Sequence, residues 1–289
     1  MIETIVEPLR FDFFVRALVA SSMVGLICAV VGTYVVLKGI SFIGDGISHA
    51  AFPGIVIAFM LGGSFHLGAA VAAVATALAI GWVSRRGLIR MDTAIGVLFA
   101  GTFALGVFLF STIERYVGDL LSFLFGNVLA ISSSDLVGLA ILGAIVLGLV
   151  AAFWKELLYA TFDPLGAAAS GVRVGLLDYL FLVIVALAIV VSLQAVGIIL
   201  VVAMLVTPAA TAQLLTVRFG RLMQLAIVIA IGSAIAGLYL SYWLEAASGA
   251  TIVLVQTTVF LLALALGPRT GLVRWARTRR AKPEAAGTA

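Results

Sequence analysis

Charged residues are scarce in this chain of 289 residues. Lys, Arg, Asp and Glu together make up 10% of it, whereas a soluble domain usually contains about 25%. Hydrophobic residues make up 64%, and the mean hydropathy is +1.27. The single cysteine, Cys28, excludes a disulfide framework and a thiolate metal site. The composition therefore excludes a soluble globule and indicates a polytopic membrane protein.

The sequence also lacks the segments that would bind nucleotides or nucleic acids. No GxxxxGK[ST] segment is present to hold nucleotide phosphates, so we expect no ATP hydrolysis by the chain itself. The loops between apolar runs are too short for a soluble domain, and no basic patch is interleaved with aromatic residues, so we predict no nucleic-acid role. Any energy source must come from a partner.

The apolar runs predict the membrane spans, since a bilayer core needs about 20 apolar residues per helix. The second run is interrupted by Pro53 and Gly54, and a shorter run at 120–131 is expected to lie at the interface or to re-enter the membrane. We predict an all-α fold of about nine transmembrane helices, with eight or ten as the alternative counts. The runs are 17–37, 47–62, 67–84, 93–113, 136–154, 176–193, 195–217, 222–244 and 251–268.

The basic residues predict the orientation, because positively charged loops stay on the cytoplasmic side. With nine spans, most of the Lys and Arg residues fall on the side of the C-terminal tail, residues 269–289. We therefore expect a single transmembrane domain over residues 1–268, an extracytoplasmic N-terminus and a basic cytoplasmic tail.

The longest cytoplasmic loop contains the segment "TFDPLGAAASGVRVG". Asp163 can accept the first free helix amides, Pro164 suits the first helical position, and Gly171 can end a helix in the left-handed conformation. The pattern predicts a short capped helix, which is either a docking surface for a partner or a linker with a stray turn. We expect Asp92, in "RMDTAIG", to cap the fourth span in the same way.

The stretch "GDGISHAAFPG" places Asp45 and His49 inside a very apolar region. A charged side chain near the bilayer centre costs about 2.5–3.5 kcal/mol, so it usually faces a cavity or a partner. At spacing i, i+4 the carboxylate and the imidazole share one helix face and can hold a cation between them. The alternative is structural: Asp45 caps a helix with help from Ser48, and His49 is a packing residue.

Three other features have competing interpretations. Pro208 in "TPAAT" frees a backbone carbonyl that Thr207, Thr211 or water could satisfy, and this predicts either a simple kink or a hinge that lines a pathway. The small residues Ser233, Gly237 and Ser241 repeat every four positions, which indicates internal helix packing. We expect His66 to lie at the outer interface rather than to bind a metal.

Four segments in order resemble the membrane subunits of bacterial ABC importers for zinc, manganese and iron. They are "GISFIGDGISHAAFPGIVIAF", "MDTAIGVLFAGTFALGV", "FLFGNVLAISSSDL" and "VVSLQAVGIILVVAMLVTPAATAQLL". The resemblance covers about residues 10 to 268. It implies a type II importer permease in the bacterial cytoplasmic membrane, with no permanently bound cofactor and with Mn²⁺, Zn²⁺ or Fe²⁺ as the substrate.

The resemblance also implies partners and residue roles. Two permease subunits, expected to be identical, would pack around a central pathway, with two ABC ATPases inside and a metal-binding protein outside. Asp45 and His49 would contact the metal. The segment 163–171 would be the coupling helix seated in the ATPase. The matching residues are Ser48, Pro53, Thr207, Pro208 and Thr211 for the pathway, and Asp163, Pro164, Leu165, Gly166 and Gly171 for the coupling helix.

Other classes fit the sequence less well. A secondary transporter would usually carry more membrane-embedded acids, and apart from Asp45 only Asp178 lies near a span. A membrane metalloenzyme would need three protein ligands and a water. The nearest alternative is a haem or siderophore permease of the same architecture, which would not need Asp45 or His49.

Overall fold

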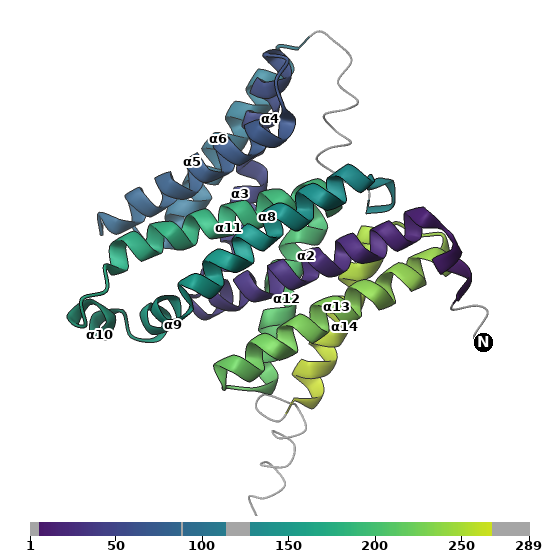
Figure 1. The fold of residues 1–289 in the computed structure, drawn as a ribbon. Helices are drawn as coiled ribbons and strands as arrows, with labels where there is room; N and C mark the ends of the chain where they lie inside the picture. The colour runs from purple at the N-terminus through teal and green to yellow at the C-terminus, as the bar shows by residue number, and fades with distance from the viewer. Residues whose placement is uncertain (1–5, 88, 114–127, 268–289) are drawn as a thin grey trace, which may run out of the picture.

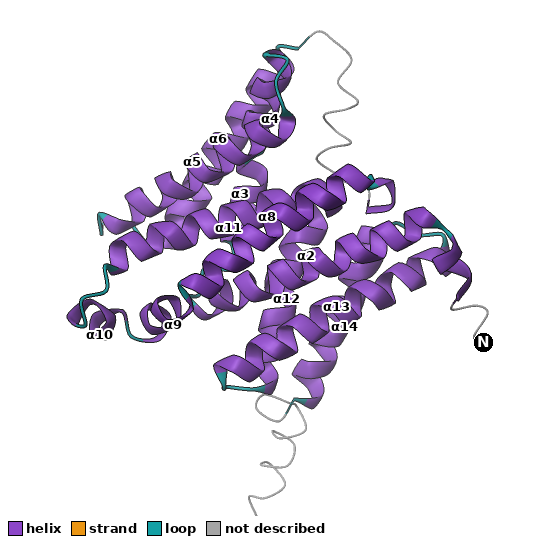
Figure 2. Ribbon diagram, viewed as in Figure 1, coloured by secondary structure: helices purple, strands orange, loops and turns teal. Residues whose placement is uncertain are grey.

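The computed structural model describes residues 6–87, 89–113 and 128–267, and all the regular secondary structure in these residues is helical (Figure 2). Nine spans within them are long and apolar enough to cross a membrane. The spans are α2 (Asp12–Leu37), α3 with α4 (Ile43–Ala50 and Phe52–Met60), α5 (Phe65–Arg85), α6 (Met91–Ser111), α8 (Ser133–Ala152), α11 (Val174–Val196), α12 (Ile198–Leu215), α13 (Phe219–Leu244) and α14 (Ser248–Leu266).

These spans confirm the predicted all-α fold and the predicted count, because each of the nine apolar runs overlaps one of them. Shorter helices complete the described chain: η1 (Glu7–Arg10), η2 (Val128–Ala130), α9 (Trp154–Phe162) and α10 (Pro164–Ala169). Most of the run 120–131 and the basic tail lie outside the described residues.

Helix α2 lies in the middle of the arrangement (Figure 1). It contacts α8, α11, α12 and α13, while α4, α5 and α6 form a group on one side and α13 and α14 lie on the other. The side chains of α2 are apolar nearly all round, and most of them are buried. Over residues 20–35 this agrees with a helix that has protein neighbours on every side, whereas Phe13, Val15 and Val19 near its start are exposed.

Glycines allow several helix pairs to approach closely. Gly32 of α2 lies against the Leu205 carbonyl of α12, and a Cβ built there would come 2.8 Å from the Leu205 carbonyl carbon. Gly237 of α13 lies against α14, since its Cβ would come 2.5 Å from the Ile252 Cα. The small-residue face around Gly237 therefore packs inside the subunit, as predicted.

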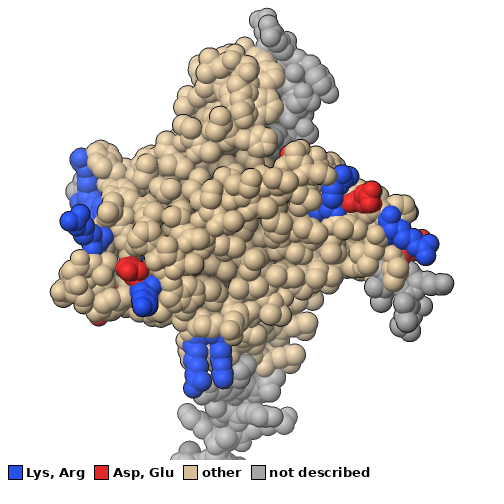
Figure 3. All heavy atoms as spheres, viewed as in Figure 1, with Lys and Arg blue, Asp and Glu red and all other residues tan. Residues whose placement is uncertain are grey.

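The charged side chains lie at the edges of the face in Figure 3, and the surface between them is uncharged. Exposed large apolar residues cover spans such as α6 and α8, for example Val97, Phe108 and Ile141. A broad uncharged surface of this kind suits contact with lipid.

The structure corrects one local prediction and adds one helix that was not predicted. Helix α6 has Arg90 as its N-cap and no side-chain cap, so Asp92 lies in the first turn and does not cap. The loop before α10 contains a further helix, α9, which buries Leu157 and Ala160.

Candidate functional site

Asp45 and His49 both lie on α3, a helix of eight residues. The N-cap of this helix is Phe42, so the alternative in which Asp45 caps it is wrong. The His49 Nε2 atom lies 3.5 Å from the Asp45 Oδ1 atom, and the two side chains are 29% and 33% exposed. The predicted pairing on one helix face is therefore present, and both groups reach the surface of the single chain.

The helix is held between two neighbours by glycines on either side of Asp45. A Cβ on Gly44 would come 2.8 Å from a methyl group of Leu205 in α12, and one on Gly46 would come 2.8 Å from a methyl group of Ile95 in α6. The α6 side of His49 is aromatic. Its ring centre lies 5.4 Å from that of Phe99 and 5.2 Å from that of Phe103, which meets it edge-on. These contacts limit the orientation of the imidazole.

One chain supplies an incomplete ligand set. Across residues 6–87, 89–113 and 128–267, no three His, Cys, Asp or Glu side chains gather closely enough to hold a metal ion. Asp45 and His49 provide one oxygen and one nitrogen donor, whereas protein sites for Zn²⁺ use three or four ligands and those for Mn²⁺ use up to six. Because the pair is partly exposed, further donors can come from outside the chain.

The other residues predicted for the pathway lie in more enclosed positions. Ser48 is fully buried and donates its hydroxyl to the Gly44 carbonyl at 2.7 Å, and Pro53 is buried in the first turn of α4. Pro208 is buried inside α12, which continues through it as one helix without a break. Thr211 donates its hydroxyl to the Thr207 carbonyl at 2.6 Å, one turn away from the carbonyl that Pro208 frees.

The predicted capped helix is confirmed as α10. Asp163 Oδ1 accepts a hydrogen bond from the Gly166 amide at 2.8 Å, and Pro164 is the first helical residue. Just past the helix, Gly171 has a φ of +87°, which favours glycine. Leu165 is 83% exposed at the tip of this helix.

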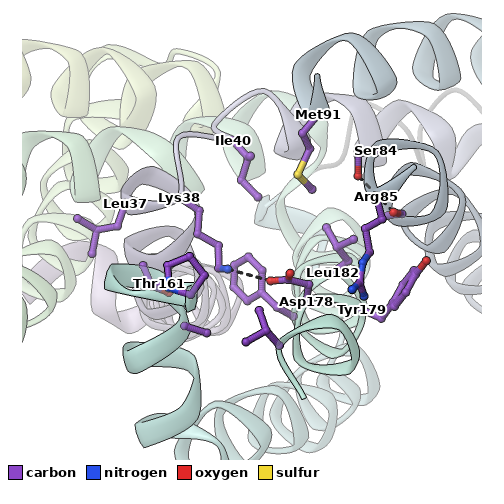
Figure 4. Close-up of a pocket in the computed structure, with 15 residues that line it drawn as sticks. Leu37, Lys38, Ile40, Ser84, Arg85, Met91, Thr161, Asp178, Tyr179 and Leu182 are labelled. Carbon is purple, nitrogen blue, oxygen red and sulfur yellow. Dashed lines mark hydrogen bonds and ion pairs between the residues drawn. The ribbon is translucent and has the colours of Figure 1, made fainter. Parts of the chain in front are cut away.

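Sequence reasoning missed a cavity of about 360 Å³ beside α10 (Figure 4). Its wall contains an ion pair in which Lys38 Nζ lies 3.1 Å from Asp178 Oδ1. The two residues are 140 positions apart. In the sequence, Lys38 counted only among the basic residues that predict the orientation, and Asp178 only as an acid near a span. No local pattern relates the two residues.

These features define a class of protein: a helical membrane transport subunit with a carboxylate and an imidazole on a short, interrupted span. The comparisons with known proteins agree. The model of the ABC 3 transport family matches residues 10–267. The chain belongs to this family, and the resemblance to the membrane subunits of metal ABC importers is confirmed.

Two relatives and one solved structure illustrate the similarity. The chain is 46% identical to the manganese transport system membrane protein MntC of Halalkalibacterium halodurans, over 96% of this chain and 95% of that protein. It is 40% identical to a probable iron transport system membrane protein of Haemophilus influenzae, over 92% and 97% of the two chains. The structure of PsaBC from Streptococcus pneumoniae in complex with Fab superposes with a TM-score of 0.83 at 35% identity, covering 96% of this chain and 100% of that one.

Proposed function

We propose that this chain is the permease subunit of an ATP-driven importer that carries divalent transition metal ions, Mn²⁺ first among them, into the bacterial cytoplasm. The ion is substrate rather than cofactor. It passes between two copies of the chain, and each copy contributes Asp45 and His49. Alternating access moves the ion, and the permease performs no covalent chemistry.

The observation that supports this proposal is the incomplete, partly exposed donor pair. Asp45 and His49 lie 3.5 Å apart on a short helix and are each about one-third exposed on the single chain. A second copy would bring the set to two carboxylates and two imidazoles, which suits Mn²⁺, Fe²⁺ and Zn²⁺. The ligand types do not separate these metals, so the preference for manganese rests on similarity to the manganese transport system membrane protein MntC, the more similar of the two relatives.

The energy source in this proposal is a pair of cytoplasmic ABC ATPases that hold α10. The support is local geometry: α10 is capped by Asp163 and presents Leu165 at 83% exposure. ATP binding would close the cytoplasmic ends through this helix and open the pathway outward, and hydrolysis would reset it. A metal-binding protein would deliver the ion from the outer side.

The orientation follows from charge. Arg85, Arg86, Arg218 and Arg221 lie near helix ends that the positive-inside rule assigns to the cytoplasm. The C-terminus would then be cytoplasmic and the N-terminus extracytoplasmic. This places α10 on the side where ATP is available.

The experiment is metal uptake by the complete importer, reconstituted in vesicles with its ATPase and binding-protein partners. We expect Asp45→Asn and His49→Ala each to lower the uptake of Mn²⁺ by about 100-fold, since the first removes the charge of the carboxylate ligand and the second removes the imidazole donor from every subunit. The matched controls are Asp92→Asn and His66→Ala, which change an acid and an imidazole outside the site. Both controls should retain uptake.

Two results would contradict the proposal. Normal uptake by the Asp45 and His49 variants would remove the metal-site assignment. Uptake by the wild type that continues without ATP would remove the ATP-driven mechanism. Parallel assays with Zn²⁺ and Fe²⁺ decide which metal the importer prefers.

A further inference from the structure

The cavity in Figure 4 lies between α10, which we propose contacts the ATPase, and the turn that leads to α3, which carries the proposed metal ligands. Its wall includes Pro164 at the start of α10, Lys38 and Ile40 in the turn that leads toward α3, and Asp178 in α11. The proposed ATPase contact and the entrance to the metal-site helix therefore border one space.

An ion pair crosses this space. Lys38 Nζ donates to Asp178 Oδ1 at 3.1 Å and lies 5.4 Å from the centre of the Phe181 ring. Lys38 is only 18% exposed and Asp178 is 40% exposed. Because Lys38 is mostly withdrawn from water, loss of its partner has a larger effect than at an open surface.

The other cation on this wall is used differently. Arg85 of α5 packs its guanidinium where a side chain on Gly175 would stand, and its Cζ lies 5.5 Å from the centre of the Tyr179 ring. Arg85 thus packs α5 against the first turns of α11. Asp178 forms its ion pair with Lys38.

Backbone hydrogen bonds connect Lys38 to the turn before α3 and connect the start of α11, which carries Asp178, to α10. Lys38 is the C-cap of α2, and the Ile40 amide donates to the Val35 carbonyl at 3.1 Å, so the turn before α3 is fixed to the end of α2. On the other side, the Val172 amide donates to the Ala167 carbonyl at 3.0 Å and joins α10 to the start of α11. A displacement of α10 therefore acts on α11, and through Asp178 on Lys38.

We infer that Lys38 and Asp178 are positioning residues that pass movement of the ATPase-bound helix α10 to the helix that carries Asp45 and His49. The inference rests on the proposed function, because it assigns a route within that mechanism. Neither residue touches the metal. Their role is to keep metal movement coupled to ATP hydrolysis.

The test measures Mn²⁺ uptake and ATP hydrolysis together in vesicles that contain the complete importer. The variants are Lys38→Met, Asp178→Asn and the exchange Lys38→Asp with Asp178→Lys. We expect Mn²⁺ moved per ATP to fall about five-fold in each single variant and to return to within about two-fold in the exchange. Arg86→Met is the matched control, because Arg86 is the C-cap of α5, as Lys38 is of α2, and its Cζ lies 3.9 Å from the centre of the Trp82 ring.

The inference is overturned if the single variants keep the wild-type ratio, or if the exchange is as defective as the single variants. If the single variants do not yield folded protein, Lys38→Arg and the exchange are measured in their place. A fall in Mn²⁺ moved per ATP in either of these two then overturns the inference. Wild-type vesicles that take up no Mn²⁺ refute the proposed function instead. The two failures are therefore distinguishable.

Discussion

The contact between α4 and α5 predicts the effect of adding one methyl group at Gly54. Gly54 and Gly68 face one another, and each lies against the carbonyl of the other. A Cβ on Gly54 would overlap the Gly68 carbonyl oxygen and would come 2.6 Å from the Ala72 Cβ. Ordinary contacts of this kind are about 3.5–4.0 Å, so α4 must move away from α5 by about 1 Å or more.

The size of the effect follows from two opposing contributions. Overpacking of a filled contact costs about 1–3 kcal/mol. Replacing glycine by alanine inside a helix recovers about 1 kcal/mol at most. The net loss for Gly54→Ala is up to about 2 kcal/mol, which corresponds to a fall in Tm of up to about 3 °C for a chain of this length.

The assay is thermal unfolding in detergent, followed by tryptophan fluorescence and by recovery from size-exclusion chromatography. Gly148→Ala is the control, because Gly148 lies in the helical interior of α8, is exposed, and has nothing within 4 Å of an added Cβ. We expect Gly148→Ala to keep or slightly raise the Tm. Equal melting of the Gly54→Ala and Gly148→Ala variants would refute the close approach of α4 and α5.

Three further outcomes are expected. Asp163→Ala should lower metal-stimulated ATP hydrolysis by the complete importer, because it removes the cap on the Gly166 amide, worth about 1 kcal/mol. Asp163→Asn keeps a capping oxygen and should retain the rate of ATP hydrolysis. Equal rates for the two variants would contradict the capping role. Cys28 is fully buried, so a maleimide should label it, as read by mass spectrometry, only when the protein unfolds, and rapid labelling of the native protein would contradict its burial. With Cys28→Ser as background, cysteines at Val6 and Ala285 should be labelled from opposite sides of the membrane, and labelling from one side would exclude an odd number of spans.

Composition and periodicity were enough to predict the nine spans, because a helix in lipid must satisfy its backbone internally and must be apolar for about 20 residues. The cap at Asp163 was also predictable, since it depends only on residues three positions apart. The placement of Asp45 and His49 on one face was a matter of helical spacing. All of these features are local in the sequence.

Features that depend on tertiary contacts were not predictable in the same way. Asp92 has the residue type of a cap, but the helix begins two residues earlier than a cap there would require, with Arg90 as its N-cap. Pro208 predicted a kink or a hinge, and it lies inside α12, which continues through it as one helix packed against α2, α13 and α14. The pair of Lys38 and Asp178 joins positions 140 residues apart, which no local pattern relates.

The two glycines that flank Asp45 have a consequence for any attempt to change the ion that is carried. Since Gly44 and Gly46 seat α3 against α12 and α6, bulk added at either position would lift the whole helix rather than alter the donor set. If Asp45 and His49 hold the ion, as we propose, redesign of metal preference has two free positions on this helix, 45 and 49, and one adjustable wall, the aromatic pair Phe99 and Phe103 beside the imidazole. A library restricted to these four positions would vary the chemistry of the site while leaving its scaffold in place.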